Sequence, residues 1–271
     1  MRLCQLLGGL LLSGVLVVSL SACADRQAPA LRTPAEAATA DSAVALLVRA
    51  DDAALRQAFE NVSSLRHARY MRTDQFDEGG LRLAYQEHVV HFGEGDAGGR
   101  GGELVQEDSS GMFDFGYARR FVSRAPDPVD PAGLPGYILP DDPAYATQRD
   151  MEAYRYHIIG DTTLHGRAVR LVRASALPGT GDDQAIRRAH VYLEERTDRI
   201  VGIYIERIER ALWLREESAL FASVERLPSG SWVPKQTRFE TLIKLPFRPS
   251  QRFRSSTSYY SFERASASSE R

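Results

Sequence analysis

Cysteine is almost absent from this chain of 271 residues, which contains two, Cys4 and Cys23. Cys4 lies in an N-terminal apolar segment, and removal of that segment would leave Cys23 as the one thiol of a mature chain of 249 residues (271 − 22). No disulfide can form within such a chain. A chain of this size buries about 70% of its extended surface and needs no crosslink. Cys23 is therefore better explained as an attachment point than as a redox or catalytic group.

An excess of positive charge is also missing. The chain has two lysines against 32 arginines (34 − 2), and without Arg2 its formal charge is about −3 (33 − 36). A nucleic-acid-binding protein would show a strong basic excess, so we expect no nucleic acid as a partner. Residues 235–264 are a local exception with a balance of +5, seven Lys and Arg against two Glu. Solvated strands and a contact with anionic lipid head groups both explain that segment.

Motifs of catalysis are absent as well. The sequence contains no Gly-x-Ser-x-Gly, no His-Glu-x-x-His and no Cys-x-x-Cys. His88 and His91 are an odd number of positions apart, so on a strand they point to opposite faces and are ordinary strand positions rather than metal ligands. We expect no enzyme, no cofactor and no metal. An open cleft that brought together His88, Glu107 and Asp141 would reverse this expectation.

The N-terminus has the layout of a secretory signal peptide. Met1-Arg2 supplies a positive start, residues 3–20 an apolar run, and Ser21-Ala22 two small residues. A retained membrane-spanning helix is the alternative, because about 18 residues just reach across roughly 30 Å of hydrocarbon. Leu20-Ser21-Ala22-Cys23 resembles the lipobox of bacterial lipoproteins. This resemblance implies cleavage before Cys23 and attachment of diacylglycerol and palmitate-type chains to its sulfur, which would join the protein to a membrane.

The rest of the chain divides into three parts. We expect a flexible tether at 23–41, rich in Ala, Pro and Thr, a single domain at 42–264, and a disordered tail at 265–271. The signal peptide occupies 1–22. Among bacterial lipoproteins, Ala24 instead of Asp directly after the cysteine implies release to the outer membrane. We therefore expect an anchored protein that faces the periplasm.

The domain begins with one helical segment and continues with strands. Apolar residues at spacings of three, four and seven predict one amphipathic helix over 42–62, with Asp41 or Ser42 as its cap. From Ala68 onward, short alternating runs are separated by turn clusters such as 77–80, 196–199 and 228–230. These connections are too short for crossover helices, so the fold class is α+β with an antiparallel sheet.

The proline-rich stretch at 124–150 interrupts the strands and must be irregular. Long loops in compact domains are often functional. Its apolar residues would be able to cover an opening in the sheet. They are Leu134, Tyr137, Ile138 and Leu139.

The order of elements resembles the lipoprotein-sorting superfamily, whose members are LolA/LolB-like. The resemblance lies in the helix followed by "RYMRTDQF" and "LRLAYQEHVVHF", and in the later hairpin "RRAHVYLEERTDRIVGIYIE". It implies a strongly curved antiparallel sheet, an incomplete barrel with the N-terminal helix packed against it. It also implies an apolar cavity that binds acyl chains by burial, in which no residue acts chemically.

Two functions remain open at this point. The first is an envelope lipoprotein that binds or transfers a hydrophobic ligand, an acyl chain or a lipoprotein. The second is a non-enzymatic interaction or sensor module, in which an edge or loop of the sheet contacts an envelope protein. Periodicity does not decide between them, because strands such as 199–207 carry apolar residues on both faces.

Overall fold

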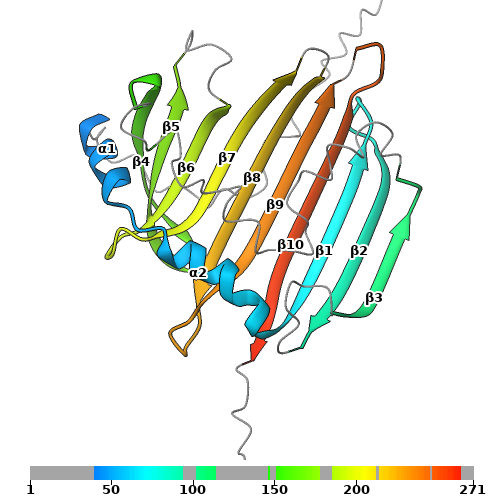
Figure 1. Cartoon of the computed structure of the whole chain (residues 1–271), viewed down its shortest axis with the longest axis horizontal. Helices are drawn as coiled ribbons and strands as arrows, with labels where there is room; N and C mark the ends of the chain where they lie inside the picture. Colours follow the sequence, from blue (N-terminus) through cyan, green and yellow to red (C-terminus); the bar gives the residue numbers. More distant parts are fainter. Residues whose placement is uncertain are drawn as a thin grey trace, which may run out of the picture.

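The computed structural model describes residues 40–93, 102–113, 146, 151–177, 185–211, 214–244 and 246–263. Within them, two helices precede an antiparallel sheet of ten strands (Figure 1). The helices are α1 (Ala40–Arg49) and α2 (Ala53–Asn61), followed by a short 3-10 turn at Val62–Ser64. The strands are β1 (Arg66–Phe76), β2 (Arg82–Phe92), β3 (Glu103–Ser110), β4 (Tyr154–Leu164), β5 (Arg167–Ala176), β6 (Ile186–Glu194), β7 (Ile200–Ala211), β8 (Leu214–Arg226), β9 (Trp232–Lys244) and β10 (Gln251–Glu263).

The prediction of one helix over 42–62 is wrong, because the chain breaks into two helices at Asp51. The backbone N–H of Asp51 donates to the carbonyl of Asp198 at 3.1 Å, and its carbonyl accepts from Ile200 at 2.8 Å. Asp51 thus forms a one-residue bridge to the turn between β6 and β7. A residue that pairs with a strand end in this way leaves the helical hydrogen-bond ladder. The first helix begins at Ala40, before both of the expected caps.

The sheet is open and curved, as the predicted fold class requires. Its strand order is β3-β2-β1-β10-β9-β8-β7-β6-β5-β4, and every neighbouring pair is antiparallel. Strand β1 pairs with β10, so β3 and β4 are the two edge strands. The chain between Ser110 and Tyr154 therefore connects opposite edges of the sheet.

The predicted turns are confirmed where local chemistry specifies them. Gly80, between β1 and β2, has φ of 82°, and Gly230, between β8 and β9, has φ of 92°. Both values lie in the left-handed region that glycine adopts without a Cβ clash. Asp77 closes the first turn, since its carboxylate accepts the backbone N–H of Leu81 at 2.8 Å.

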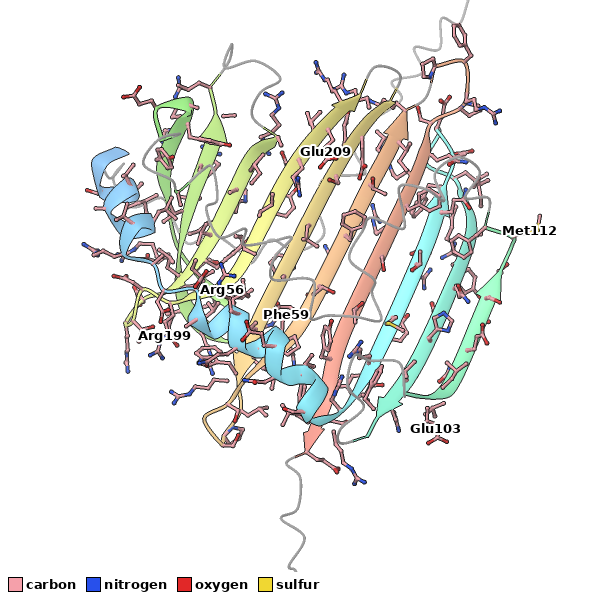
Figure 2. The ribbon with its side chains drawn as sticks, in the orientation of Figure 1. Arg56, Phe59, Glu103, Met112, Arg199 and Glu209 are labelled. Atoms are coloured by element: carbon pink, nitrogen blue, oxygen red, sulfur yellow. The ribbon has the colours of Figure 1, made fainter. Side chains whose placement is uncertain are left out.

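The main core lies between α2 and one face of the sheet, which we call the inner face. Val201, Ile203 and Ile205 of β7 point to this face and are buried. Helix α2 contacts β7, β8 and β9, and Phe59 meets Tyr259 of β10 edge to face at 6.4 Å. Figure 2 shows α2 crossing these strands with Phe59 on it. Helix α1 contacts β4, so the two helices together pack mainly on the half of the sheet from β4 to β9.

The opposite, outer face is closed at one end by the β4–β5 hairpin. Nε2 of His165 lies 2.8 Å from the hydroxyl of Ser223 on β8, three strands away from β5. Arg167 stacks on Trp232 of β9 at 5.1 Å. A Cβ on Gly202 would lie 2.8 Å from Leu164, so the hairpin approaches β7 where that strand has no side chain. These contacts between distant strands show how strongly the sheet curves.

Within the part of the chain that the structure describes, no helix combines the length and apolar character needed to span a membrane.

We predict that Phe59→Ala lowers the free energy of unfolding by about 3–5 kcal/mol, because it removes a fully buried ring and leaves a void. Val48→Ala on α1 is the control, since Val48 is 64% exposed and should change stability by less than about 0.5 kcal/mol. Urea denaturation measures both. Equal stability of Phe59→Ala and the control would show that α2 does not hold the core.

Candidate functional site

The inner face continues from β9, the last strand that α2 contacts, over β10, β1 and β2. Strand register places eight buried side chains there, with exposed fractions of 2–9%. Four are apolar and four are polar: Met71, Ala84, Ile243 and Phe253, with Gln75, Thr237, Thr241 and Thr257. This part of the inner face, which we call the ligand face, is thus mixed rather than wholly apolar.

Apolar and polar members of the ligand face lie side by side on neighbouring strands. Phe253 lies directly opposite Gln75 on one side and Thr241 on the other. Met71 lies opposite Thr257 on β10 and His88 on β2. Short hydroxyl side chains beside larger apolar ones offer both surface for burial and oxygens for hydrogen bonds.

A buried arginine lies next to the ligand face. Arg69 has no exposed surface, and its guanidinium stacks on the ring of Phe92 at 4.0 Å and lies 5.5 Å from the ring of Tyr259. Its Nε donates to Nε2 of His67 at 3.0 Å. Stacking on aromatic faces stabilises a guanidinium that has left water.

The hydrogen bonds of His67 define its protonation. Nδ1 lies 2.8 Å from the carbonyl of Leu65, which can only accept, so Nδ1 carries the proton. Nε2 then accepts from Arg69. The pKa of His67 is lowered to about 4, mainly by burial and in part by the charge of Arg69, whereas the Leu65 carbonyl opposes the shift. The neutral ring of His67 is stacked between the rings of Phe92 and Phe262, whose centroids lie 4.8 and 5.6 Å from its own.

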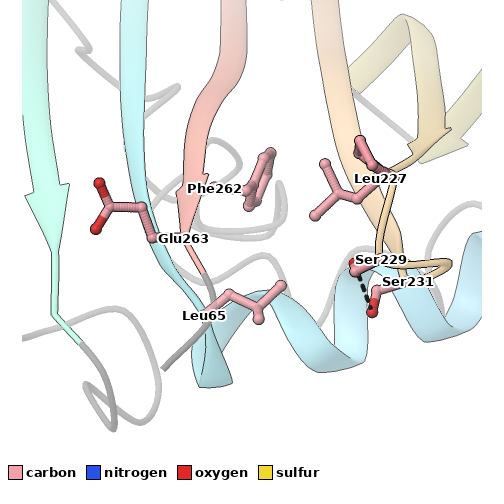
Figure 3. Close-up of a pocket in the computed structure, with 7 residues that line it drawn as sticks. Leu65, Leu227, Ser229, Ser231, Phe262 and Glu263 are labelled. Carbon is pink, nitrogen blue, oxygen red and sulfur yellow. Dashed lines mark hydrogen bonds between the residues drawn. The ribbon is translucent and has the colours of Figure 1, made fainter. Parts of the chain in front are cut away.

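A small pocket opens where β10 ends beside the turn between β8 and β9 (Figure 3). Its volume is about 160 Å³. The walls are Leu65, Leu227, Pro228, Ser229, Ser231, Phe262 and Glu263. Pockets for drug-sized ligands occupy about 300–1,000 Å³, so this one accommodates a single ring or a short aliphatic group.

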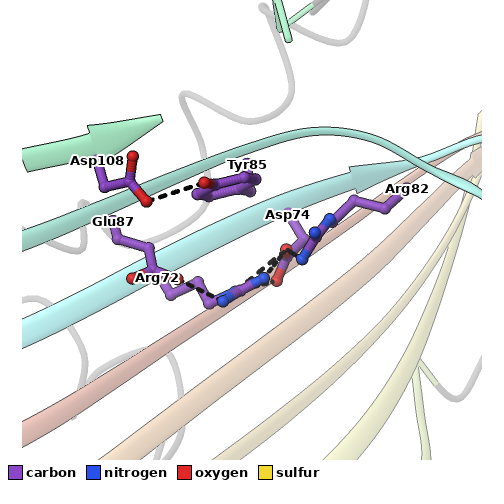
Figure 4. A network of polar contacts seen from close by, with 6 residues as sticks. All are labelled: Arg72, Asp74, Arg82, Tyr85, Glu87 and Asp108. Atoms are coloured by element: carbon purple, nitrogen blue, oxygen red, sulfur yellow. Dashed lines mark hydrogen bonds and ion pairs between the residues drawn. The ribbon is translucent and has the colours of Figure 1, made fainter. Parts of the chain in front are cut away.

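The outer face of β1, β2 and β3 carries a network of charges (Figure 4). Arg72 donates to Asp74 at 2.9 Å and to Glu87, and Arg82 lies 3.5 Å from Asp74. Tyr85 donates to Asp108 at 2.8 Å. Since these pairs satisfy one another, the network stabilises strand pairing and presents no free reactive group.

The residues predicted as the lipidation site and the cover of the cavity lie outside the described residues. They are Cys23, Leu134, Tyr137, Ile138 and Leu139. They remain predictions.

The two histidines lie on β2, His88 beside Met71 and His91 beside Ala68, and so point to opposite faces as predicted. His88 also lies directly opposite Glu107 of β3, whereas Asp141 is outside the described residues. Among the described residues, no group of three or more His, Cys, Asp or Glu side chains is placed to hold a metal ion.

Sequence reasoning missed the cluster around Arg69. The alternation in "RHARYMRTDQF" places Arg69 on the same face as Met71, so a buried arginine was visible as a break in the apolar pattern. Its aromatic partners were not, because Tyr259 lies 190 positions later and meets Arg69 only through the pairing of β1 with β10.

No family model matches the chain, and no curated protein sequence does. A DUF1329 family protein from Desulfovibrio piger is similar over 85% of this chain and 95% of its own, at 13% identity and a TM-score of 0.29. A putative outer membrane lipoprotein-sorting protein domain from Vibrio parahaemolyticus is similar over 86% and 96%, at 11% identity and a TM-score of 0.27. A LolA superfamily protein from Nitrosomonas europaea is similar over 83% and 93%, at 6% identity and a TM-score of 0.23.

We predict that stability falls as the pH is lowered from about 6.5 to about 4, because the unfolded chain binds a proton at His67 that the folded chain excludes. The shift corresponds to about 3 kcal/mol for this one group. His67→Gln should remove that part of the pH dependence in denaturation experiments at pH 7, 5.5 and 4. Identical pH dependence in the variant and the unmodified chain would contradict the assignment.

Proposed function

We propose that the chain is an envelope lipoprotein, anchored by lipidated Cys23, that binds a hydrophobic ligand on the ligand face of its sheet. The ligand would be an acyl chain or the acylated end of another lipoprotein. Anchoring to the outer membrane on the periplasmic side follows from Ala24. The protein would bind and release its ligand without chemical change, so no catalytic residue is required.

The observation that carries this proposal is the composition of the ligand face. Met71, Ile243 and Phe253 are buried. None of them is on β4, the strand that α1 mainly contacts. Met71 and Phe253 also lie on β1 and β10, outside the strands that α2 mainly contacts. Each methylene group transferred from water to such a surface contributes about 0.8 kcal/mol. The hydroxyls of Thr241 and Thr257 would hydrogen-bond the ester or carboxyl end of the same ligand.

The strand order supports a role for the cover residues. Because β3 and β4 are opposite edges, residues 111–153 must run from one edge of the sheet to the other. Leu134, Tyr137, Ile138 and Leu139 lie in the middle of that connection. We therefore assign them to the closure of the ligand face.

An interaction module is the second candidate, and edge strand β3 favours it. All eight residues of β3 are exposed, with Leu104 and Val105 at 50% and 54%. Figure 2 shows Glu103 and Met112 at this edge of the sheet. An exposed edge is a template on which an extended segment of a partner adds a strand. Crosslinking from Val105 in cells separates the two functions: one stoichiometric partner favours the module, and a range of lipoproteins favours the carrier.

For the ligand face, we predict that protein isolated from cells carries acyl species detectable by native mass spectrometry. Met71→Gln should reduce their amount severalfold, because burial of an amide without a partner costs about 1–3 kcal/mol. Tyr70→Gln, one residue away on the outer face, is the matched control and should retain them. A wild-type chain that neither retains nor accepts acyl ligands would refute the proposal.

For the anchor, we predict that Cys23→Ser abolishes incorporation of a palmitate analogue. The mature N-terminal peptide of the unmodified chain should begin at Cys23 and carry the added mass of its lipids. The variant should remain an uncut precursor, or become soluble if another peptidase cuts near Ala22. An unlabelled wild-type chain that still begins at Met1 would identify a membrane-spanning anchor instead.

A further inference from the structure

Most cations on the outer face have a carboxylate partner. Arg188 pairs with Glu206 at 3.1 Å, Arg254 with Glu240 at 3.2 Å and Lys244 with Glu217 at 2.9 Å. Arg173 of β5 differs, because it makes no ion pair or hydrogen bond through its side chain with any residue that the structure describes. Its Nε is buried without a partner. A buried N–H that donates to nothing is rare in folded proteins and calls for an explanation.

A second unsatisfied nitrogen lies directly beside it. His190 of β6 is the register partner of Arg173, and its Nε2 is likewise buried without a hydrogen bond within the described part of the chain. Neighbouring strands lie about 4.8 Å apart, so one small ligand would reach both side chains. The ring of Tyr204, the next register partner on β7, lies 5.4 Å from that of His190.

The surroundings of this pair are basic. His157 on β4 lies opposite Arg173. Arg155, two positions before His157 on the same face of β4, is exposed and makes no ion pair with a described residue. Arg188 lies two positions from His190 on β6. The three arginines, Arg155, Arg173 and Arg188, and Glu206 leave a local balance of +2 (3 − 1).

Glu206, the carboxylate that pairs with Arg188, forms no ion pair with Arg173. Glu206 accepts from Arg188 at 3.1 Å and from the hydroxyl of Tyr204 at 2.8 Å, and both bonds use the same oxygen. The pKa of His190 is lowered to about 4, mainly by burial and in part by the charges of Arg188 and Arg173. The histidine is therefore neutral at pH 7, and its ring can donate one hydrogen bond to an anion.

We propose that Arg173, His190, Arg155 and His157 form an anion site on the outer face that binds a phosphate group. A tetrahedral phosphate offers several acceptor oxygens, which suits donors that come from three neighbouring strands. The planar fork of Arg173 would bind two of them, His190 a third, and Arg155 would add charge from the rim. The phosphate would be either free inorganic phosphate or the head group of an anionic lipid. The site lies on the face opposite the ligand face, so it is independent of the acyl ligand.

The test is a calorimetric titration of the full chain in non-ionic detergent with two probes, inorganic phosphate and dihexanoyl phosphatidylglycerol. We expect saturable binding of at least one probe. Arg173→Gln should weaken it by about tenfold or more, the effect of losing charge-assisted hydrogen bonds. Arg173→Lys, which keeps the charge and loses the fork, should give an intermediate affinity.

Arg254→Gln is the matched control, because Arg254 lies on the same face and is paired with Glu240. The affinity of this variant for the phosphate probe should stay within about twofold of that of the unmodified chain. Binding of inorganic phosphate alone would identify a free anion, and tighter binding of the lipid would identify a head group. Binding of neither probe, or equal binding by Arg173→Gln and the unmodified chain, would overturn the site. Thermal denaturation of Arg173→Gln confirms that the variant is folded.

Discussion

The pairing of β1 with β10 is the constraint on which the rest of the architecture depends. It joins a three-stranded unit, β1 to β3, to a seven-stranded meander, β4 to β10, through backbone hydrogen bonds between strands about 180 positions apart. Without it the two units would each have an open edge in the middle of the molecule. With it, β3 and β4 become the outer edges, and residues 111–153 must bridge them. The pairing also brings Arg69 to Tyr259 and Met71 to Thr257, so it assembles both the buried arginine cluster and the ligand face.

The two faces of the sheet use charge in different ways. On the outer face, ion pairs between neighbouring strands satisfy most charged side chains, as in the network of Arg72, Asp74 and Glu87. On the inner face, Arg69 is stacked on aromatic rings next to a neutral histidine. A protein that only needed stability would gain little from such a residue, because removal of a charge from water is costly. Its position next to the ligand face adds a charged group beside a surface of mixed apolar and polar side chains.

Local features of the fold were predictable from the sequence, and features made by distant contacts were not. The hairpin between β1 and β2 follows from Asp77 and Gly80, residues that specify the turn by themselves. The antiparallel sheet follows from connections too short for helices. The break at Asp51 was hidden, because its partners Asp198 and Ile200 lie almost 150 positions away. Periodicity alone assigns residues 42–62 to one helix.

The ligand face was partly visible in the sequence. Thr237, Phe239 and Ile243 are spaced by even numbers of positions and so share one face of β9, yet nothing in that strand shows which strands lie beside it. Only the order of the strands places Phe253 and Met71 near those residues. Cys23 and the cover residues Leu134 to Leu139 rest on motif and composition, and they lie outside the described residues. The proposed function therefore depends on the ligand face.

Photocrosslinking with a diazirine-bearing fatty acid tests most directly whether an acyl chain binds on the ligand face. Mass spectrometry of the labelled peptides would show where the acyl chain lies. The account predicts labels on the β1 and β10 peptides that contain Met71 and Phe253, and competition by unlabelled fatty acid. Labels confined to exposed apolar residues, such as Leu81 in the turn between β1 and β2 and Val105 on edge strand β3, or no competed label at all, would contradict it.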